Sequence, residues 1–322
     1  MLFELAYPAL RLMEGVRRLY TPWLDHRTSA FGDDPQPARF RHLRSRLRRL
    51  DIQLMTAVLP LAGGLLALRR FERDRAAAPA APLPVDHFLR TGKGTLAVRL
   101  CGNPDGRRAL LLHGWGADGT MVWPLAQLLA DAGFRVVVPD LPGDGASHFA
   151  PLSFHEKGRL VAAHCGSLGP YDCVIGHSAG SLIAAVALEE GLQAGRLITV
   201  SAPQSLGSLL QGYLVQTSAP RRLTDAILRV YRFVYRVDPR HVGPRTFARM
   251  GRRLLVVHAR ADWQVVSAEA HAILAVARDA GSLFLDNCNH RTVLSHPALT
   301  RAIVEFIDNK HAEAQVEHAD TA

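Results

Sequence analysis

The chain has 322 residues, of which 48% are hydrophobic and 21% charged, a balance that excludes an intrinsically disordered or low-complexity protein. Its formal net charge is +9, but arginine supplies 35 of the 38 basic residues. Such a preference for arginine over lysine often reflects the base composition of the genome. The charge alone therefore does not predict a nucleic-acid or membrane partner. The length suffices for one large domain with an extension.

The amino-terminal part of the sequence is basic and amphipathic. Residues 39–50, RFRHLRSRLRRL, place apolar side chains at spacings of three and four, as on one helix face, and include six arginines. Residues 52–68 add 17 uncharged positions, the lower limit for a membrane span. Three interpretations stay open: a helical hairpin docked on the following domain, peripheral membrane contact through residues 39–68, or a true span. No aromatic platform accompanies the arginines, so we expect no nucleic-acid binding.

Strand and helix signals alternate after an Ala/Pro-rich linker at residues 76–84. This alternation predicts a mostly parallel sheet with helices on both faces. An antiparallel hairpin is expected to open the sheet near Gly92. The predicted strands then lie at 108–114, 134–140, 171–178, 196–203, 252–259 and 282–288, and the helices at 120–132, 153–168, 179–190, 267–279 and 297–309.

The segment between the strands at 196–203 and 252–259 is too long for a structureless loop. Its residues 223–237 have the apolar spacing of a helix, so we predict a small helical cap at about 204–251. The resulting domain scheme is a helical extension with its linker at 1–84, a main domain at 85–310 and a flexible polar tail at 311–322.

The four cysteines have neither metal-ligand spacing nor the pattern of a small disulfide framework. We interpret them as free thiols in a reducing compartment; they are Cys101, Cys165, Cys173 and Cys288. The first residues, MLFELAYPAL, have no basic region before the apolar stretch, so we expect no secretory signal. The predicted location is the cytoplasm, with the basic amino-terminal part as a candidate for contact with the inner face of the membrane.

One short stretch carries the chemical signal. G-H-S-A-G at 176–180 follows a predicted buried strand and opens a predicted helix. Gly176 and Gly180 allow the tight turn that exposes a nucleophilic serine, and the helix start offers N–H groups to a developing oxyanion. Ser178 is therefore the candidate nucleophile, and it needs a histidine base held by a carboxylate.

At this point the chain resembles the α/β-hydrolase family, whose triad residues follow the order serine, acid, histidine. In this resemblance Asp262, three residues beyond the strand at 252–259, is the acid, and Asp286 is its rival. His290, in the loop before the last helix, is the base, and His296 is its rival. The loop reads D-N-C-N-H, whereas many relatives have glycine directly before the histidine.

The resemblance also implies the remaining parts of the site. His113-Gly114-Trp115 matches the family's oxyanion loop, so the backbone N–H groups of Trp115 and Ala179 are the expected oxyanion donors. Trp115 and His177 are the expected substrate contacts. A D-x-x-G-x-G-x-S pattern at 140–147 is expected to shape a neighbouring loop.

The predicted protein is thus an α/β hydrolase with a small helical cap and an extra amino-terminal helical region. We expect it to cleave small carboxylic esters through an acyl-serine, without a metal or an organic cofactor. Three alternatives stay open: a thioesterase or lysophospholipase at a membrane surface, a ligand-binding protein that keeps the triad, and a membrane-tethered interaction protein. The sequence does not indicate an oligomeric state.

Overall fold

The structure is a computed structural model that describes residues 60–73, 83–149, 152–216 and 221–319. The chain divides into two compact units. The first unit combines Met1–Phe71 with Tyr213–Arg236, and the second combines Glu72–Gly212 with Val237–Ala322. The predictions for residues 39–59 lie outside the described residues, and the domain boundaries drawn from the sequence stay predictions.

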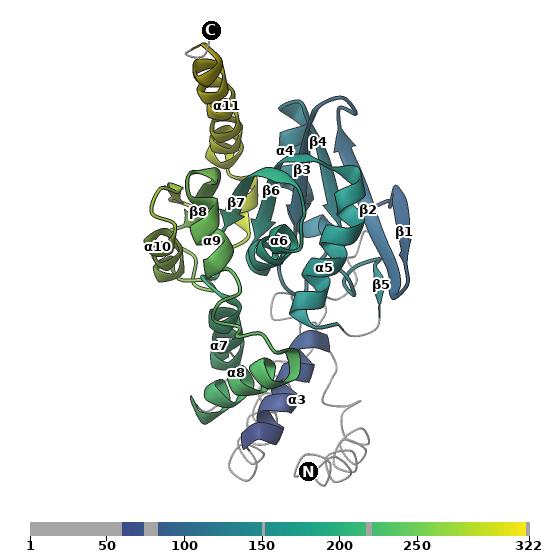
Figure 1. Ribbon diagram of the computed structural model, residues 1–322, viewed down its shortest axis with the longest axis vertical. Helices are drawn as coiled ribbons and strands as arrows, with labels where there is room; N and C mark the ends of the chain where they lie inside the picture. The colour runs from purple at the N-terminus through teal and green to yellow at the C-terminus, as the bar shows by residue number, and fades with distance from the viewer. Residues whose placement is uncertain (1–59, 74–82, 150–151, 217–220, 320–322) are drawn as a thin grey trace. The chain divides into compact units, whose positions relative to one another are not determined.

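A mostly parallel sheet forms the centre of the second unit (Figure 1). Its strand order is β1-β2-β4-β3-β6-β7-β8-β9, with the short β5 paired to β2. The strands around β2 are antiparallel, as the predicted opening hairpin requires, and the pairs from β4 to β9 are parallel. The strands are β1 (His87–Thr91), β2 (Gly94–Gly102), β3 (Arg107–Leu112), β4 (Phe134–Pro139), β5 (His148–Phe149), β6 (Tyr171–His177), β7 (Ala194–Val200), β8 (Leu254–Ala259) and β9 (Gly281–Leu285).

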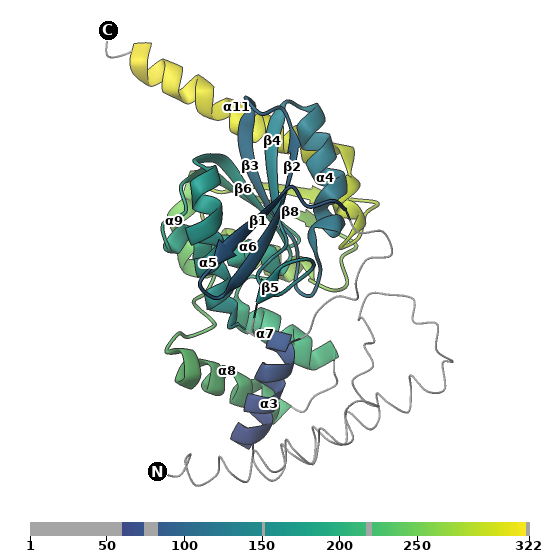
Figure 2. The same cartoon turned by 90° about the vertical axis from the view of Figure 1, so that its right-hand side faces the viewer.

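Helices cover both faces of this sheet, as predicted (Figure 2). On one face lie α4 (Gly119–Asp131) and α11 (Pro297–Ala319), and on the other lie α5 (Phe154–Cys165) and α6 (Ala179–Glu189). The inner parts of the strands between them are mainly apolar because both of their faces are buried. The remaining helices of the unit include α9 (Pro244–Met250), α10 (Ser267–Val276) and the 3-10 turn η3 (Thr292–Ser295).

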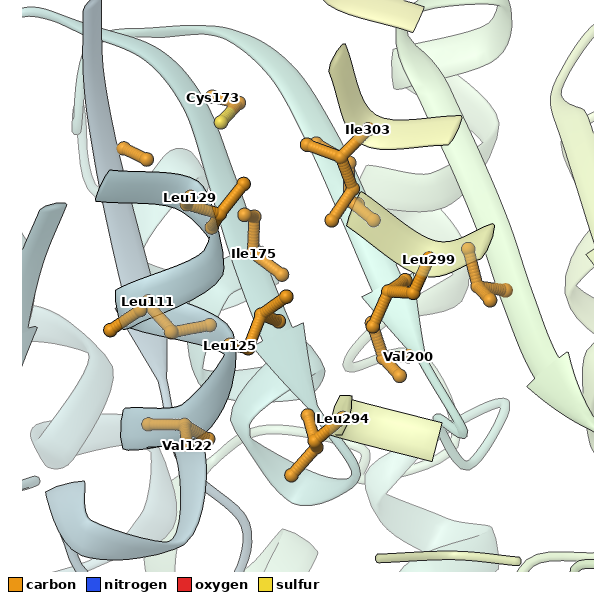
Figure 3. Packing of buried hydrophobic residues seen from close by; sticks show 14 of the residues in the cluster. Leu111, Val122, Leu125, Leu129, Cys173, Ile175, Val200, Leu294, Leu299 and Ile303 are labelled. Atoms are coloured by element: carbon orange, nitrogen blue, oxygen red, sulfur yellow. The ribbon is translucent and has the colours of Figure 1, made fainter. Parts of the chain in front are cut away.

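The hydrophobic core on the α4 side joins distant parts of the sequence (Figure 3). Leu125 and Leu129 project from α4 at helical spacing onto Ile175 of β6. Leu299 and Ile303 of α11 pack toward Val200 of the same sheet. Each of these side chains is fully buried, so the core fixes the two helices against the strands that lead into the site.

The order in which strands join the sheet reverses at β3. Its neighbour on one side is β4 and on the other is β6, where Leu112 is in register with Gly176. At such a point in a parallel sheet, the loops that leave the carboxyl ends of neighbouring strands run apart, and this is the usual ligand position. The G-H-S-A-G stretch lies at this end of β6.

The first unit is helical in its described part. It contains most of α3 (Pro60–Arg73), the end of α7 (Leu206–Gln216) and α8 (Arg221–Tyr235). A Cβ atom at Gly64 would lie 2.9 Å from the Ala226 carbonyl carbon, so only glycine permits this approach of α3 to α8. No helix within the described ranges is both long and apolar enough to cross a membrane.

The structure differs from the predicted elements in several places, three of which concern the sheet and its last helix. The two-residue strand β5 was not predicted, because so short a strand has no periodicity. Helix α11 continues to Ala319 rather than ending near 309, since the added residues are mainly good helix formers. Asp286 follows the end of β9 at Leu285 instead of lying within the strand.

Candidate active site

Ser178 occupies a strained turn between β6 and α6. Its φ of 53° and ψ of −126° lie in a region that non-glycine residues rarely adopt, at a cost of about 1–3 kcal/mol. The turn is held because the Ser178 N–H donates to the Val200 carbonyl oxygen at 2.8 Å. The Ser181 N–H donates to the Ser178 carbonyl oxygen at 3.0 Å. This is the backbone form of a nucleophile elbow.

The two glycines of the stretch are required sterically. A Cβ atom at Gly176 would lie 2.3 Å from the Ser181 Cα, and one at Gly180 would lie 2.5 Å from the His113 carbonyl oxygen. Both obstacles are backbone atoms, which cannot rotate away as a side chain could. Position 176 therefore lets α6 begin close to β6, and position 180 lets it pack against the end of β3.

The structure brings Asp262 and His290 together, although 28 residues separate them. Asp262 Oδ2 lies 2.7 Å from His290 Nδ1, and both residues are buried. The other carboxylate oxygen accepts the N–H groups of Gln264 and Val265, each at 2.9 Å. Burial alone would raise the pKa of Asp262, but the hydrogen bonds to the ionised form hold it below the usual value of 3.8.

The rival residues lie elsewhere in the fold. The side chain of Asp286 is 71% exposed and forms an ion pair with Arg260 at 3.4 Å. His296 Nδ1 accepts the Ala298 N–H at 3.2 Å at the start of α11. Neither contact involves Ser178, so the geometry favours the Asp262–His290 pair over both alternatives.

His177 lies between the serine turn and the histidine loop. Its Nε2 is 2.8 Å from the His290 carbonyl oxygen, and the two rings are 4.8 Å apart between centroids. The side chain was expected to contact substrate, but it is only 1% exposed in this structure. Burial first, and the nearby His290 second, lower the pKa of His177 to about 3.

The His113–Trp115 loop reaches the serine turn from β3. A Cβ atom at Gly114 would lie 3.3 Å from the Ser178 Cβ, so the loop lies directly beside the candidate nucleophile. His113 fixes the loop, since its Nε2 accepts the Leu141 N–H at 2.8 Å and its Nδ1 lies 2.9 Å from the Gly114 oxygen. Trp115 is half-buried in this loop.

The other expected oxyanion donor is Ala179. It is the first residue of α6 and is 1% exposed. Its N–H belongs to the amino-terminal turn of the helix, where the dipole favours negative charge. The structure shows no hydrogen bond between the Ser178 hydroxyl and His290, both of which it describes. Such contacts often close only when substrate is bound.

A buried ion pair supports the same edge of the sheet. Asp140 Oδ1 lies 2.7 Å from Arg99 Nη1 and also accepts the Gly119 N–H at 2.7 Å. Its second oxygen accepts the Ala146 N–H at 2.7 Å. The D-x-x-G-x-G-x-S pattern thus has the predicted structural role. Arg99 was missed, because nothing in its local sequence marks the partner of a distant aspartate.

Asn289, which directly precedes the candidate base where many relatives have glycine, has a structural role. Its Oδ1 accepts the N–H groups of Arg291 and Thr292 at 3.0 and 3.1 Å, and Thr292 Oγ1 accepts the Asn289 N–H at 2.8 Å. These contacts close an Asx-type turn around His290. The Asn289 side chain therefore stabilises the loop conformation at a position where many relatives have glycine.

The sequence and the fold place the protein in a known family. Residues 109–303 match the sequence profile described as the alpha/beta hydrolase family, a match over more than half of the chain. The chain belongs to the alpha/beta hydrolase family. The order of the candidate residues along this hydrolase chain, serine, then acid, then histidine, is the order expected of the family.

One curated relative of this hydrolase is an esterase. It is a pimeloyl-[acyl-carrier protein] methyl ester esterase from Vibrio cholerae, 34% identical over 139 residues. The match covers 42% of this chain and 52% of the relative, so it spans about half of that protein's length. The relative is thus an ester-cleaving enzyme, by its name, and this chain shares its family.

Solved structures support the fold. A thioesterase domain from a curacin biosynthetic pathway has a TM-score of 0.52 at 18% identity, covering 70% of this chain and 99% of that domain. An esterase from Rhodococcus sp. ECU1013 has a TM-score of 0.51 at 16% identity, covering 70% of this chain and 99% of the other. At these identities the likeness concerns the fold alone.

Proposed function

We propose that the protein is a serine hydrolase that cleaves carboxylic esters through an acyl-serine intermediate. Ser178 is the nucleophile, His290 the general base and Asp262 the residue that orients the imidazole. The observation that carries the proposal is the buried 2.7 Å contact between Asp262 and His290, on a loop that contacts the residue preceding Ser178. The proposal is also supported by chain position, because Ser178, Asp262 and His290 follow the carboxyl ends of β6, β8 and β9 of the parallel part of the sheet.

In the proposed mechanism the Ser178 oxygen attacks the ester carbonyl while His290 Nε2 takes the hydroxyl proton. The tetrahedral intermediate then expels the alcohol, which receives that proton from His290. A water molecule attacks the acyl-serine with His290 again as base, and the acid product leaves. Asp262 stays ionised throughout, because its lowered pKa keeps the carboxylate charged beside the imidazolium.

The proposed oxyanion site uses two backbone N–H groups, those of Trp115 and Ala179. One lies on the loop after β3 and the other at the start of α6, and both loops meet at Ser178. Each donor in such a site stabilises the transition state by about 3 kcal/mol. The half-buried Trp115 side chain is the proposed substrate contact.

The substrate class is proposed as a small carboxylic ester. The name of the Vibrio cholerae relative, a methyl ester esterase, supports an ester over other acyl compounds. A thioester is the alternative, because the same acyl-serine chemistry would cleave it. Hydrolysis rates measured on esters of graded acyl chain length will identify the preferred acyl group.

The test is hydrolysis of p-nitrophenyl esters and an acyl thioester by the purified full-length chain and by Ser178→Ala. We expect ester turnover that the substitution lowers by at least about 10⁴-fold. Ser167→Ala, at an exposed serine of the same unit, is the matched control and should keep full activity. Turnover unchanged in Ser178→Ala would contradict the proposal. Ligand retention without turnover would favour a binding protein instead.

We further propose a cytoplasmic location with contact between residues 39–68 and the inner face of the membrane. The support is compositional: six arginines on an amphipathic pattern precede 17 uncharged residues. Sedimentation of the full chain with vesicles, compared with a chain lacking residues 1–80, tests this proposal. Equal sedimentation of the two would overturn it.

A further inference from the structure

The positive charge of the protein is concentrated in the first unit. That unit, Met1–Phe71 with Tyr213–Arg236, holds 17 arginines against seven acidic residues, a net charge of +10. The second unit has 21 basic and 22 acidic residues, a net charge of −1. Genome base composition acts on the whole chain, so it accounts for arginine over lysine but not for this segregation.

The described part of the first unit presents some of this charge on one surface of α8. We call it the α8 arginine surface; its residues are Arg229, Arg232, Phe233 and Arg236, which line a hollow of about 320 Å³ (helix α8, Figure 1). The three arginines are exposed; Arg229 and Arg232 lie three residues apart on α8, and Arg236 directly follows the end of the helix at Tyr235, with a φ of 58°. The opposite face is buried inside the unit.

Apolar side chains accompany these cations. Phe233 is 58% exposed and Val234 is 42% exposed, although both are large hydrophobic residues. Arg236 lies over the Phe233 ring at 5.3 Å. Guanidinium groups bind phosphates in bidentate fashion, and adjacent aromatic and aliphatic side chains suit the depth just below lipid headgroups.

We propose that the α8 arginine surface docks on an anionic phospholipid bilayer. The arginines bind headgroup phosphates, and Phe233, which lines the same hollow, enters the interface between them. A nucleic acid fits less well, because the surface has one exposed aromatic ring rather than a row of stacking platforms. The docking is separate from any contact made by residues 39–68, because it uses a different segment of the chain.

Co-sedimentation with vesicles tests this docking, using the full-length chain throughout. Phosphatidylcholine vesicles are compared with phosphatidylcholine–phosphatidylglycerol vesicles, and the variant carries Arg229→Gln, Arg232→Gln and Arg236→Gln. We expect binding only to the anionic vesicles, with the triple variant weakened about a hundredfold, since each cation near the surface contributes about 1 kcal/mol. Added salt should weaken the unaltered chain more than the variant.

A matched control removes the same charge from the second unit. It carries glutamine at three exposed arginines, Arg249, Arg278 and Arg301, and should bind the vesicles within about threefold of the unaltered chain. Equal losses in the two triple variants would overturn the proposal, because net charge alone would then explain binding. Full binding by the α8 variant, or binding to acidic protein or nucleic acid but not to vesicles, would also overturn it.

A second inference concerns His177 and rests on the proposed function. A carbonyl oxygen only accepts hydrogen bonds, so His177 Nε2 carries the proton that it donates to the His290 oxygen at 2.8 Å. Its Nδ1 has no hydrogen-bond partner among the described residues, and the ring is buried. A second proton on this ring would therefore lack an acceptor.

We infer that His177 is a positioning residue for the base. It touches His290 twice, through the backbone oxygen and through the ring 4.8 Å away. It thereby ties the histidine loop to the strand that ends at Ser178. Because its lowered pKa keeps it neutral, it places no second positive charge beside the imidazolium that forms at His290.

The rate of Ser178 phosphonylation by a fluorophosphonate tests this role without knowledge of the substrate. His177→Leu removes the donor while filling the space, whereas His177→Gln keeps an N–H donor. We expect His177→Leu to react about thirtyfold more slowly, because a misplaced base costs up to about a hundredfold, and His177→Gln to recover most of the rate.

The controls separate positioning from folding and from the proposed function. Both variants are checked by thermal unfolding, and the downfield proton resonance of the His290–Asp262 hydrogen bond should shift in His177→Leu and return in His177→Gln. Two folded variants that react at the same rate would overturn the positioning role. Absence of labelling in the unaltered chain would instead contradict the proposed function.

Discussion

The Ser178 turn and the Asp262–His290 pair meet at one edge of the sheet, but different forces hold them. Backbone sterics fix the serine turn: two glycines with no room for a Cβ atom, and main-chain hydrogen bonds at 2.8 and 3.0 Å. Side-chain hydrogen bonds fix the pair, through the carboxylate of Asp262 and the amide of Asn289. Substitutions at the turn should therefore damage fold and activity together. Substitutions at the pair should separate the two.

The largest expected effect is a loss of ester turnover on substitution at the Asp262–His290 pair. Asp262→Asn keeps the shape of the side chain but removes the charge that orients and stabilises the protonated imidazole. We expect ester turnover to fall by about 10⁴-fold while the protein stays folded. Steady-state kinetics and circular dichroism check the two halves of this statement. Near-normal turnover in a folded Asp262→Asn protein would remove this residue from the mechanism.

On the sterically held side, Gly176→Ala forces a methyl group against the backbone of Ser181. We expect the free energy of unfolding to fall by about 3 kcal/mol, with activity lost in parallel. The control is Gly212→Ala in α7, where an added Cβ atom meets nothing within 4 Å. This substitution should stabilise the helix by about 1 kcal/mol, because alanine has a higher helix propensity than glycine. Denaturant unfolding of both variants measures the contrast, and equal stabilities would contradict the steric account.

Asn289→Ala tests the turn that carries the base. It removes an acceptor for two N–H groups, so we expect stability to fall by about 1 kcal/mol and turnover by about tenfold. Asn103→Ala removes a similar turn acceptor, which bonds the Asp105 N–H at 3.1 Å in a distant loop. It should lower stability alone. If both variants kept full turnover, the Asn289 turn would not position His290.

The smallest expected effect is on the pH dependence of stability. Because the folded pKa of Asp262 is lowered, the unfolded chain binds the proton first as the pH falls. The resulting stabilisation is fully present above the usual pKa of 3.8 and is lost as the pH falls through the folded value. The stability difference between the unaltered chain and Asp262→Asn should therefore be constant at neutral pH and shrink only in acid. A difference that grew toward acid pH would have the wrong sign.

Most of the sheet and the candidate residues followed from local sequence. Buried strands such as β6 are continuous apolar runs, and glycines at fixed distances from Ser178 mark a turn that few other residues permit. The acid and base were assigned through the resemblance to the α/β-hydrolase family, in which they follow particular strands. The structure brings Asp262 and His290 into contact, whereas their catalytic roles stay a proposal.

Other features depend on tertiary contacts that no local pattern records. The bond from His177 to the His290 backbone spans 113 residues, and the ion pair of Arg99 with Asp140 spans 41. The turn made by Asn289 could have been suspected, since asparagine readily caps turns where relatives use glycine. The concentration of positive charge in the first unit depends on the fold, because that unit combines α8 with the distant amino-terminal segment.

The most direct test of the proposed catalytic triad is covalent labelling. It asks which residue is labelled and whether the labelling rate depends on Asp262 and His290. The full-length chain is treated with a fluorophosphonate, digested and analysed by mass spectrometry. We predict a single adduct on Ser178 whose rate of formation falls sharply in both Asp262→Asn and His290→Ala. An adduct on another residue, or labelling of Ser178 at an unchanged rate in both variants, would contradict the account.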